Sequence, residues 1–231
     1  MKKPELVLSL LGAIAVSFSA QASVIEWVDW TTADNSAGTA AGSMNTTNGV
    51  IGVQYLGDIW SAQTTTEHTT FWWTEYDPAP YTGNSVIDNA PGDNDIIRVQ
   101  GSGITNTITF SQDVYMPVMA FVSVGSVSTG VSYNFDQPFT LLSEGWGWYG
   151  DGSWTQSGNS FTGFEAHGAI QFDGWVSSIS WNNDVAELWH GFTVGVTKVQ
   201  PVPVPAAAPR SGPAPPCLAR YRPPRPADGS R

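Results

Sequence analysis

Apolar residues recur at every second position of this chain, and no stretch after residue 22 has the spacing of an amphipathic helix. In the run LWHGFTVGV (188–196), one face of an extended strand carries Leu188, His190, Phe192, Val194 and Val196. The runs TNTITF (105–110), AIQF (169–172) and SSISW (177–181) alternate in the same way. Such alternation of β-branched and aromatic residues is typical of half-buried strands, so the sequence predicts an all-β protein.

One run is apolar on both faces. MPVMAFVSV (116–124) has the pattern expected of a central strand. Turn-forming residues separate the runs, among them Asp151-Gly152, which predicts a hairpin turn, and the loop DNAPGDND (88–95). Many short strands joined by turns predict a single β-sandwich domain, jelly-roll-like, over residues 23–199.

The N-terminus has the layout of a secretory signal peptide. Lys2 and Lys3 precede an apolar run over residues 6–18, and Ala20 and Ala22 form a small-x-small cleavage site. We therefore expect residues 1–22 to be removed after Ala22 and the protein to be exported. The alternative is a membrane anchor, but this run of 13 residues is short of the ~20 that a spanning helix needs.

The predicted domain is strongly acidic. Between Ser23 and Thr197, Arg98 is the one basic residue against 18 Asp and Glu, which gives 1 − 18 = −17, whereas the whole chain carries −11. Such a surface repels phosphate backbones, so nucleic-acid binding is excluded. The single cysteine, Cys217, excludes a disulfide framework and a cysteine-based zinc site.

Residues 200–231 change to a proline-rich, basic composition without apolar alternation, which predicts a disordered tail. The tail opens on a short proline motif made of Val202, Pro203, Val204, Pro205 and Ala206. This motif resembles the sorting signal of exosortase-dependent bacterial surface proteins, the PEP-CTERM class and its VPxPA variants. Stretches of the body, VMAFVSVG (118–125), YNFDQPFTLLSEGWGWYGDGSW (133–154) and WHGFTVGV (189–196), with DNDIIRVQGSG before them, resemble a domain attached to such signals.

The resemblance implies an exported surface protein with the sorting machinery as a partner, from bacteria that produce exopolysaccharide. The tail departs from the class because no apolar membrane helix follows the motif, although Arg220, Arg222 and Arg225 stand where the terminal arginines belong. A frameshifted or decayed helix would explain this and would leave the product released. An ordinary disordered basic tail is the alternative.

Catalytic signals are sparse. His68, His167 and His190 are widely spaced and form no metal-binding or nucleophile motif, and His190 is expected to be a hydrogen-bonded core residue. We therefore predict no enzymatic activity. Glu144 and Glu165, which lie near aromatic residues, leave a glycosidase using paired carboxylates as an alternative.

Aromatic residues suggest a binding surface. Most of the 11 tryptophans, Trp27 and Trp181 included, are expected to fill the core. Trp146 and Trp148 alternate with glycines, so we expect them to project from one face of a strand as an exposed platform that stacks on sugar rings. The other predicted members of this binding site are Tyr149, Trp154, Glu144 and Asp151.

A cation site is a further expectation. Asp88, Asp93 and Asp95 crowd one loop, and oxygen ligands at this density suit Ca²⁺. No other cofactor is expected. Together these features predict a bacterial cell-surface or extracellular-matrix protein, non-enzymatic, that associates with exopolysaccharide or another matrix component. The alternatives are the glycosidase and a purely structural coat protein.

Overall fold

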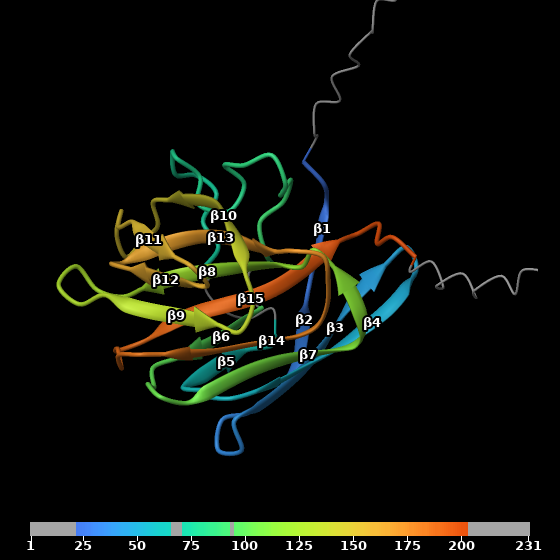
Figure 1. The fold of residues 1–231 in the computed structure, drawn as a ribbon, viewed down its shortest axis with the longest axis horizontal. Coiled ribbons are helices and arrows are strands. Elements are labelled where there is room, and N and C mark those ends of the chain that lie inside the picture. The colour runs from blue at the N-terminus through green and yellow to red at the C-terminus, as the bar shows by residue number, and fades with distance from the viewer. Residues whose placement is uncertain (1–21, 66–70, 93–94, 203–231) are drawn as a thin grey trace, which may run out of the picture. The chain divides into compact units, whose positions relative to one another are not determined.

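The computed structural model describes residues 22–65, 71–92 and 95–202, and all regular elements in those ranges are β-strands (Figure 1). Two antiparallel sheets pack as a sandwich, which confirms the predicted all-β fold. The seven-stranded sheet contains β10 (Phe139–Gly145), β13 (Ala166–Phe172), β8 (Val118–Val124), β15 (His190–Thr197), β6 (Ile96–Val99) and β5 (Ser61–Gln63) in that order, with β1 (Ile25–Trp27) also paired to β15. The eight-stranded sheet contains, in order, β11 (Trp154–Ser157), β12 (Ser160–Gly163), β9 (Val131–Phe135), β14 (Trp175–Asn183), β7 (Thr105–Tyr115), β4 (Gly49–Leu56), β3 (Thr39–Thr46) and β2 (Asp29–Asp34).

The connections between strands agree with the predicted jelly-roll-like topology. From β7 onward the chain crosses between the two sheets at almost every connection, and the β11–β12 hairpin is the exception. As a result, strands that neighbour one another within a sheet are distant in the sequence. The last residues of β8 therefore lie beside the first residues of β13 and β15, at one end of the sandwich.

Aromatic rings fill the space between the sheets. Phe121 on β8 lies 4.9 Å from Tyr133 and 5.1 Å from Phe161, measured between ring centroids. Trp154 packs edge-on against Phe161 at 4.5 Å and is buried. The predicted core residues Ile179 and Trp181 on β14 are also buried here. Edge-to-face packing of this kind adds to the stabilisation that burial of the rings provides.

A second apolar cluster covers the outer face of the seven-stranded sheet. Phe71, Trp72 and Tyr81, from the long segment between β5 and β6, pack over Val118 and Ala120 of β8. Every residue of β8 is buried, because one face meets the other sheet and the opposite face meets this segment. The prediction of a central strand that is apolar on both faces is therefore confirmed.

Two local predictions are wrong. Strand β15 begins at His190, and Leu188 is 79% exposed in the preceding loop. Asp151-Gly152 does not close a hairpin. Instead, Gly152 forms a bridge with Ala166, and a Cβ atom on Gly152 would lie 1.6 Å from the carbonyl oxygen of Phe164. The glycine at this position permits close approach of two backbones and not a turn.

The folded domain extends one residue beyond the predicted boundary. Gln200, assigned above to the tail, is buried, and its side chain accepts a hydrogen bond of 2.7 Å from the backbone N–H of Tyr115. Of the sorting motif, Val202 is described and is exposed, while residues 203–206 lie outside the described residues, as do Ala20, His68 and Cys217. Within the described part of the chain there is no helix long and apolar enough to cross a membrane.

Trp148 and Trp154, which are six residues apart in the chain, test which side chains form the core. Trp154 is buried between the sheets and Trp148 is 72% exposed. We expect Trp154→Ala to lower the free energy of unfolding by about 3–5 kcal/mol, as other large-to-small core changes do. Trp148→Ala should change the free energy of unfolding by no more than about 0.5 kcal/mol. Urea titration of both variants measures the difference, and equal midpoints would contradict this assignment of the core.

Candidate functional site

A cleft of about 470 Å³ opens where the ends of β8, β13 and β15 meet. We call it the cleft, and it combines carboxylates, hydroxyl groups and aromatic rings. Its lining residues are Ser123, Ser126, Thr129, Tyr149, Glu165, Ala186, Glu187, Leu188 and Trp189. They come from the end of β8, the β8–β9 connection, the segment after β10, the residue before β13 and the β14–β15 loop.

A strained pair of residues forms one wall. Ser123 (φ 55°) and Glu165 (φ 61°) both adopt the left-handed backbone region, which non-glycine residues rarely occupy. Their side chains are joined, because Ser123 Oγ donates a hydrogen bond of 2.6 Å to Glu165 Oε1. The pairing of β8 with β13 shifts register at this point, where His167 stands between Ala166 and Gly168. Bulges of this kind redirect side chains and are frequent beside functional sites.

Burial changes the acidity of Glu165. Partial burial raises the pKa of the Glu165 carboxyl, the hydrogen bond from Ser123 lowers it, and the negative charge of Glu187 raises it. The net shift is upward, so this carboxyl holds its proton at higher pH than an exposed glutamate does. A half-buried carboxyl with a raised pKa in a cleft is a feature of functional sites, although structural networks produce it as well.

Glu187 is the second carboxylate of the cleft, and contacts with Gly125 and His190 hold its side chain in place. Its Oε2 accepts a hydrogen bond of 2.8 Å from the backbone N–H of Gly125 and lies 3.1 Å from Nδ1 of His190. The His190 ring is fully buried and packs edge-on against Tyr133 at 5.3 Å. The prediction that His190 is a hydrogen-bonded core histidine is therefore confirmed, and its partner is a cleft residue.

His167 lies behind the strained pair. It is fully buried, and its Nδ1 accepts a hydrogen bond of 3.3 Å from the backbone N–H of Ser123. The remaining proton of the neutral ring is then on Nε2, which has no partner among the described residues. Burial lowers the pKa of His167 to about 4, so the ring is neutral at pH 7.

Aromatic rings form the opposite wall. Tyr149 lies edge-on to Trp189 at 4.9 Å and to Trp73 at 5.7 Å. It sits at the tip of a two-residue turn with Trp148, closed by hydrogen bonds between Gly147 and Gly150. The turn approaches the His167 ring closely at Gly147, where a Cβ atom would be 2.6 Å from that ring, so this position requires glycine.

Arg98 extends the aromatic wall beyond the cleft. Its guanidinium carbon lies 5.8 Å from the ring centroid of Trp189, 5.3 Å from that of Phe71 and 5.1 Å from that of Trp60. Trp60 is 42% exposed. A continuous strip therefore runs from Tyr149 through Trp189 and Arg98 to Trp60, and cations stabilise such arrangements by attraction to the ring faces.

The predicted platform is confirmed in its exposure and wrong in its geometry. Trp146, Trp148 and Tyr149 are exposed, but β10 ends at Gly145, so the two tryptophans do not share the face of a strand. Trp154 does not belong to the platform because its ring lies in the core, as described above.

The two predicted carboxylates, Glu144 and Asp151, have different surroundings in the structure. Glu144 accepts a hydrogen bond of 3.2 Å from the backbone N–H of Trp154, which fastens the segment between them, and Asp151 is exposed. The carboxylate beside Glu165 in the cleft is Glu187 and not Glu144. The predicted pair Glu144–Glu165 is therefore replaced by Glu165–Glu187.

One of the three predicted calcium ligands, Asp95, does not face the solvent. Asp95 is buried, and its Oδ1 accepts a hydrogen bond of 2.9 Å from the backbone N–H of Trp30. Burial raises the pKa of Asp95 to about 6, and the nearby charge of Asp29 adds to the rise. Asp88 is exposed and Asp93 lies outside the described residues. Among the described residues, no three His, Cys, Asp or Glu side chains gather as a metal site would require.

Sequence reasoning missed Ser123, Glu187, Trp189 and Arg98 as site residues. Glu187 falls just before the strand predicted over 188–196, and loop residues at strand ends often carry function. Trp189 was assigned to that strand, whereas the observed strand begins at His190. Arg98 had a signal of its own, as the one basic residue of the acidic body. The meeting of these residues depends on cross-sheet topology, which periodicity does not reveal.

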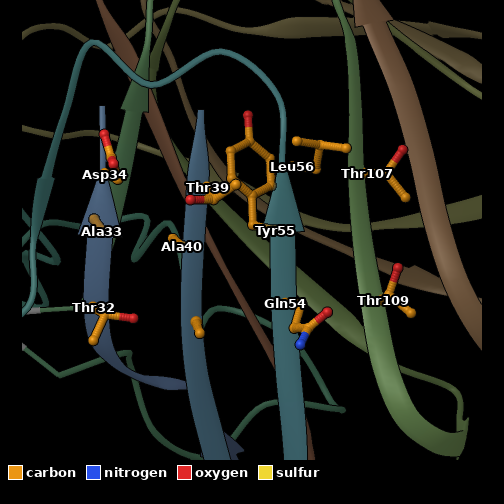
Figure 2. A pocket seen from close by; sticks show the side chains of 11 residues that line it. Thr32, Ala33, Asp34, Thr39, Ala40, Gln54, Tyr55, Leu56, Thr107 and Thr109 are labelled. Atoms are coloured by element: carbon orange, nitrogen blue, oxygen red, sulfur yellow. The ribbon is translucent and has the colours of Figure 1, made fainter. Parts of the chain in front are cut away.

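A larger hollow, of about 600 Å³, lies on the outer face of the eight-stranded sheet over β2, β3, β4 and β7. Figure 2 shows its lining, in which Thr32, Thr39, Thr107 and Thr109 are prominent. Asp34 is its acidic side chain, and hydrogen bonds from Ser36 and Ala37 lower the pKa of that carboxyl. Exposed aromatic rings and a carboxyl of raised pKa are both missing from this lining, so the cleft is the better candidate.

Comparison of the chain with protein-family models, with curated proteins and with solved structures gives no match. The functional reasoning below therefore depends on the site itself.

The buried His167 gives the protein a specific pH dependence. Its pKa of about 4 in the folded state lies below the unfolded value of 6.5, so the unfolded chain binds the extra proton first. The contribution of His167 to the free energy of unfolding is fully present above pH 6.5. As the pH falls toward 4, the free energy of unfolding decreases by on the order of 3 kcal/mol. We expect the stability advantage of the wild type over His167→Gln to shrink across this range in urea titrations. Glu165 and Asp95 titrate in both proteins, so a difference that stays constant with pH would contradict the assignment.

Proposed function

We propose that this chain is an exported, non-enzymatic protein that binds polysaccharide at the bacterial cell surface or in the extracellular matrix, and that the cleft is its binding site. The observation that carries the proposal is the pairing of two kinds of group in one cleft. Tyr149 and Trp189 offer apolar ring surface, and Glu165 and Glu187 offer oxygen acceptors. Sugars present both an apolar ring face and hydroxyl donors, so they match both kinds of group.

Support for export comes from the signal-like N-terminus, and support for a bacterial surface setting comes from the sorting-motif resemblance. The acidic body suits an extracellular protein that must stay soluble at high local polymer concentration. Trp148, which is exposed and precedes the cleft residue Tyr149 in the chain, favours a ligand longer than one sugar. A purely structural coat protein would have no use for a cleft of this composition.

Removing the aromatic wall tests the proposal. We expect Tyr149→Ala to weaken retention on the polysaccharide that the wild type binds by about tenfold or more, because aromatic anchors dominate such interfaces. Trp175→Ala is the matched control, since Trp175 is 42% exposed against 41% for Tyr149 and lies outside the cleft. Affinity electrophoresis through a panel of neutral and acidic polysaccharides provides the measurement. A wild type that no polymer retards, or equal effects of the two variants, would refute the proposal.

A glycosidase is the second candidate, and the raised pKa of Glu165 beside Glu187 favours it. In that reaction Glu165 donates its proton to the glycosidic oxygen as the C–O bond breaks. Glu187 accepts a proton from the water that attacks the anomeric carbon, so that the leaving sugar ends as an alcohol and the other product as a hemiacetal, the new reducing end. The strained backbone at Glu165 and Ser123 is also a feature of catalytic sites.

Assay of reducing ends separates the two functions. Under the binding proposal, neither the wild type nor Glu165→Gln releases new reducing ends from a polymer that both retain. Glutamine keeps the acceptor for Ser123 Oγ but cannot supply the proton, so it serves as the matched control. Release by the wild type that Glu165→Gln abolishes would establish the glycosidase and end the non-enzymatic proposal.

A further inference from the structure

Arg98 is a half-buried cation that forms no ion pair with any residue that the structure describes. The ion pairs among the described residues are His190 with Glu187 and Lys198 with Glu26, and neither involves Arg98. The Nε atom of Arg98 is buried and has no hydrogen-bond partner among the described residues. Of the 18 acidic residues between Ser23 and Thr197, Glu67 and Asp93 lie outside the described residues, and none of the others forms an ion pair with Arg98.

The three surrounding rings satisfy the charge only in part. Trp60, Phe71 and Trp189 place their π systems within 5.1–5.8 Å of the guanidinium carbon. Rings attract the charge, but the planar fork of N–H donors is best satisfied by oxygen acceptors, above all the two oxygens of a carboxylate. Burial lowers the pKa of Arg98, which reflects the cost of keeping the charge partly out of water. An oxygen acceptor from outside the chain would offset that cost.

The position of Arg98 indicates where that acceptor would lie. Trp189 contacts Arg98 on one side and lines the cleft on the other. Tyr149, also in the lining, is close enough for its ionised form to interact electrostatically with the guanidinium. Arg98 therefore adjoins the aromatic wall of the cleft, and a chain of sugars along the aromatic strip would pass it.

We infer that the polysaccharide bound in the cleft is acidic, and that Arg98 pairs with a carboxylate carried by one of its sugars. Hydroxyl groups of a neighbouring sugar donate to Glu165 and Glu187, which keeps the ligand's carboxylate away from these two residues. The inference rests on the proposed function, since it names the ligand class of the same cleft.

The net negative charge of the body does not oppose this pairing. At physiological ionic strength charges are screened over about 8 Å, so distant surface carboxylates act weakly on a sugar held in the cleft. A guanidinium in hydrogen-bond contact, partly shielded from water, is screened much less. Local complementarity therefore decides which sugar is bound, and the surrounding charge mainly slows its approach.

The test compares an acidic polymer with a neutral one of similar size. Alginate oligosaccharides carry a carboxylate on every sugar, dextran oligosaccharides carry none, and dextran sulfate carries sulfate in its place. We expect Arg98→Gln to weaken binding of alginate oligosaccharides by about 10- to 100-fold, as loss of a charge-assisted hydrogen bond does. Binding of dextran oligosaccharides should change less than about twofold, because no charge is involved.

Two further variants keep the result interpretable. Arg98→Lys retains the charge beside the three rings but loses the planar fork, so it should recover part of the alginate affinity and the wild-type melting temperature. Lys198→Gln removes an exposed cation outside the cleft and should change neither affinity. Equal losses on alginate and dextran would show that Arg98 only supports the three rings, and would overturn the inference. Equal Arg98 dependence on dextran sulfate and alginate would overturn the choice of carboxylate.

Failure of the inference is distinguishable from failure of the proposed function. If Tyr149→Ala weakens binding while Arg98→Gln leaves the alginate affinity unchanged, the cleft binds polysaccharide and the acidic ligand is wrong. If Tyr149→Ala leaves every affinity unchanged, the proposed function itself fails. Isothermal titration calorimetry with each oligosaccharide gives the affinities, and thermal melts of each variant confirm that the fold is intact.

Discussion

Both faces of the central strands of the seven-stranded sheet are buried, and the arrangement of the layers around them follows from that constraint. β8 is buried at all of its positions, and so is β13. The eight-stranded sheet covers one face, so a second element must cover the other. The segment between β5 and β6 does so with Phe71, Trp72 and Tyr81. Two rings of this segment also support the aromatic wall of the cleft, because Phe71 packs edge-on against Trp189 and Trp73 packs edge-on against Tyr149.

The cleft lies at one end of these buried strands, where β8 ends and β13 and β15 begin. Ser123 and Glu165 are held there in strained conformations, and His167 is buried behind them. Rigid strands on both sides stabilise these unfavourable local states, which a flexible loop would relax. A wall fixed in this way suits either tight recognition of a sugar or chemistry on it, and the raised pKa of Glu165 is compatible with both.

The sequence predicted the parts of the structure that depend on local pattern. Alternation located β7, β13 and β14, and the run that is apolar on both faces located β8. This was possible because the residue pattern of each strand depends on the burial of that strand alone. The glycines on either side of Trp146 and Trp148 correctly indicated exposed rings. Trp154 was misassigned because its ring points into the core from the edge strand β11, and sequence proximity to exposed rings carries no information about that direction. Glu187 was missed as the partner of Glu165 because the two are joined only by the crossing of strands between sheets.

The central claim is that polysaccharide contacts the aromatic strip bordering the cleft, and the 11 tryptophans provide the most direct test. Each indole N–H gives its own signal in a two-dimensional ¹H–¹⁵N spectrum, assigned by single substitutions. On addition of oligosaccharides from a polymer that the protein retains, the signals of Trp60, Trp148 and Trp189 should shift with one common affinity. Those of the buried Trp30, Trp154 and Trp181 should stay in place. Unchanged signals for Trp60, Trp148 and Trp189 at saturating ligand would contradict the account.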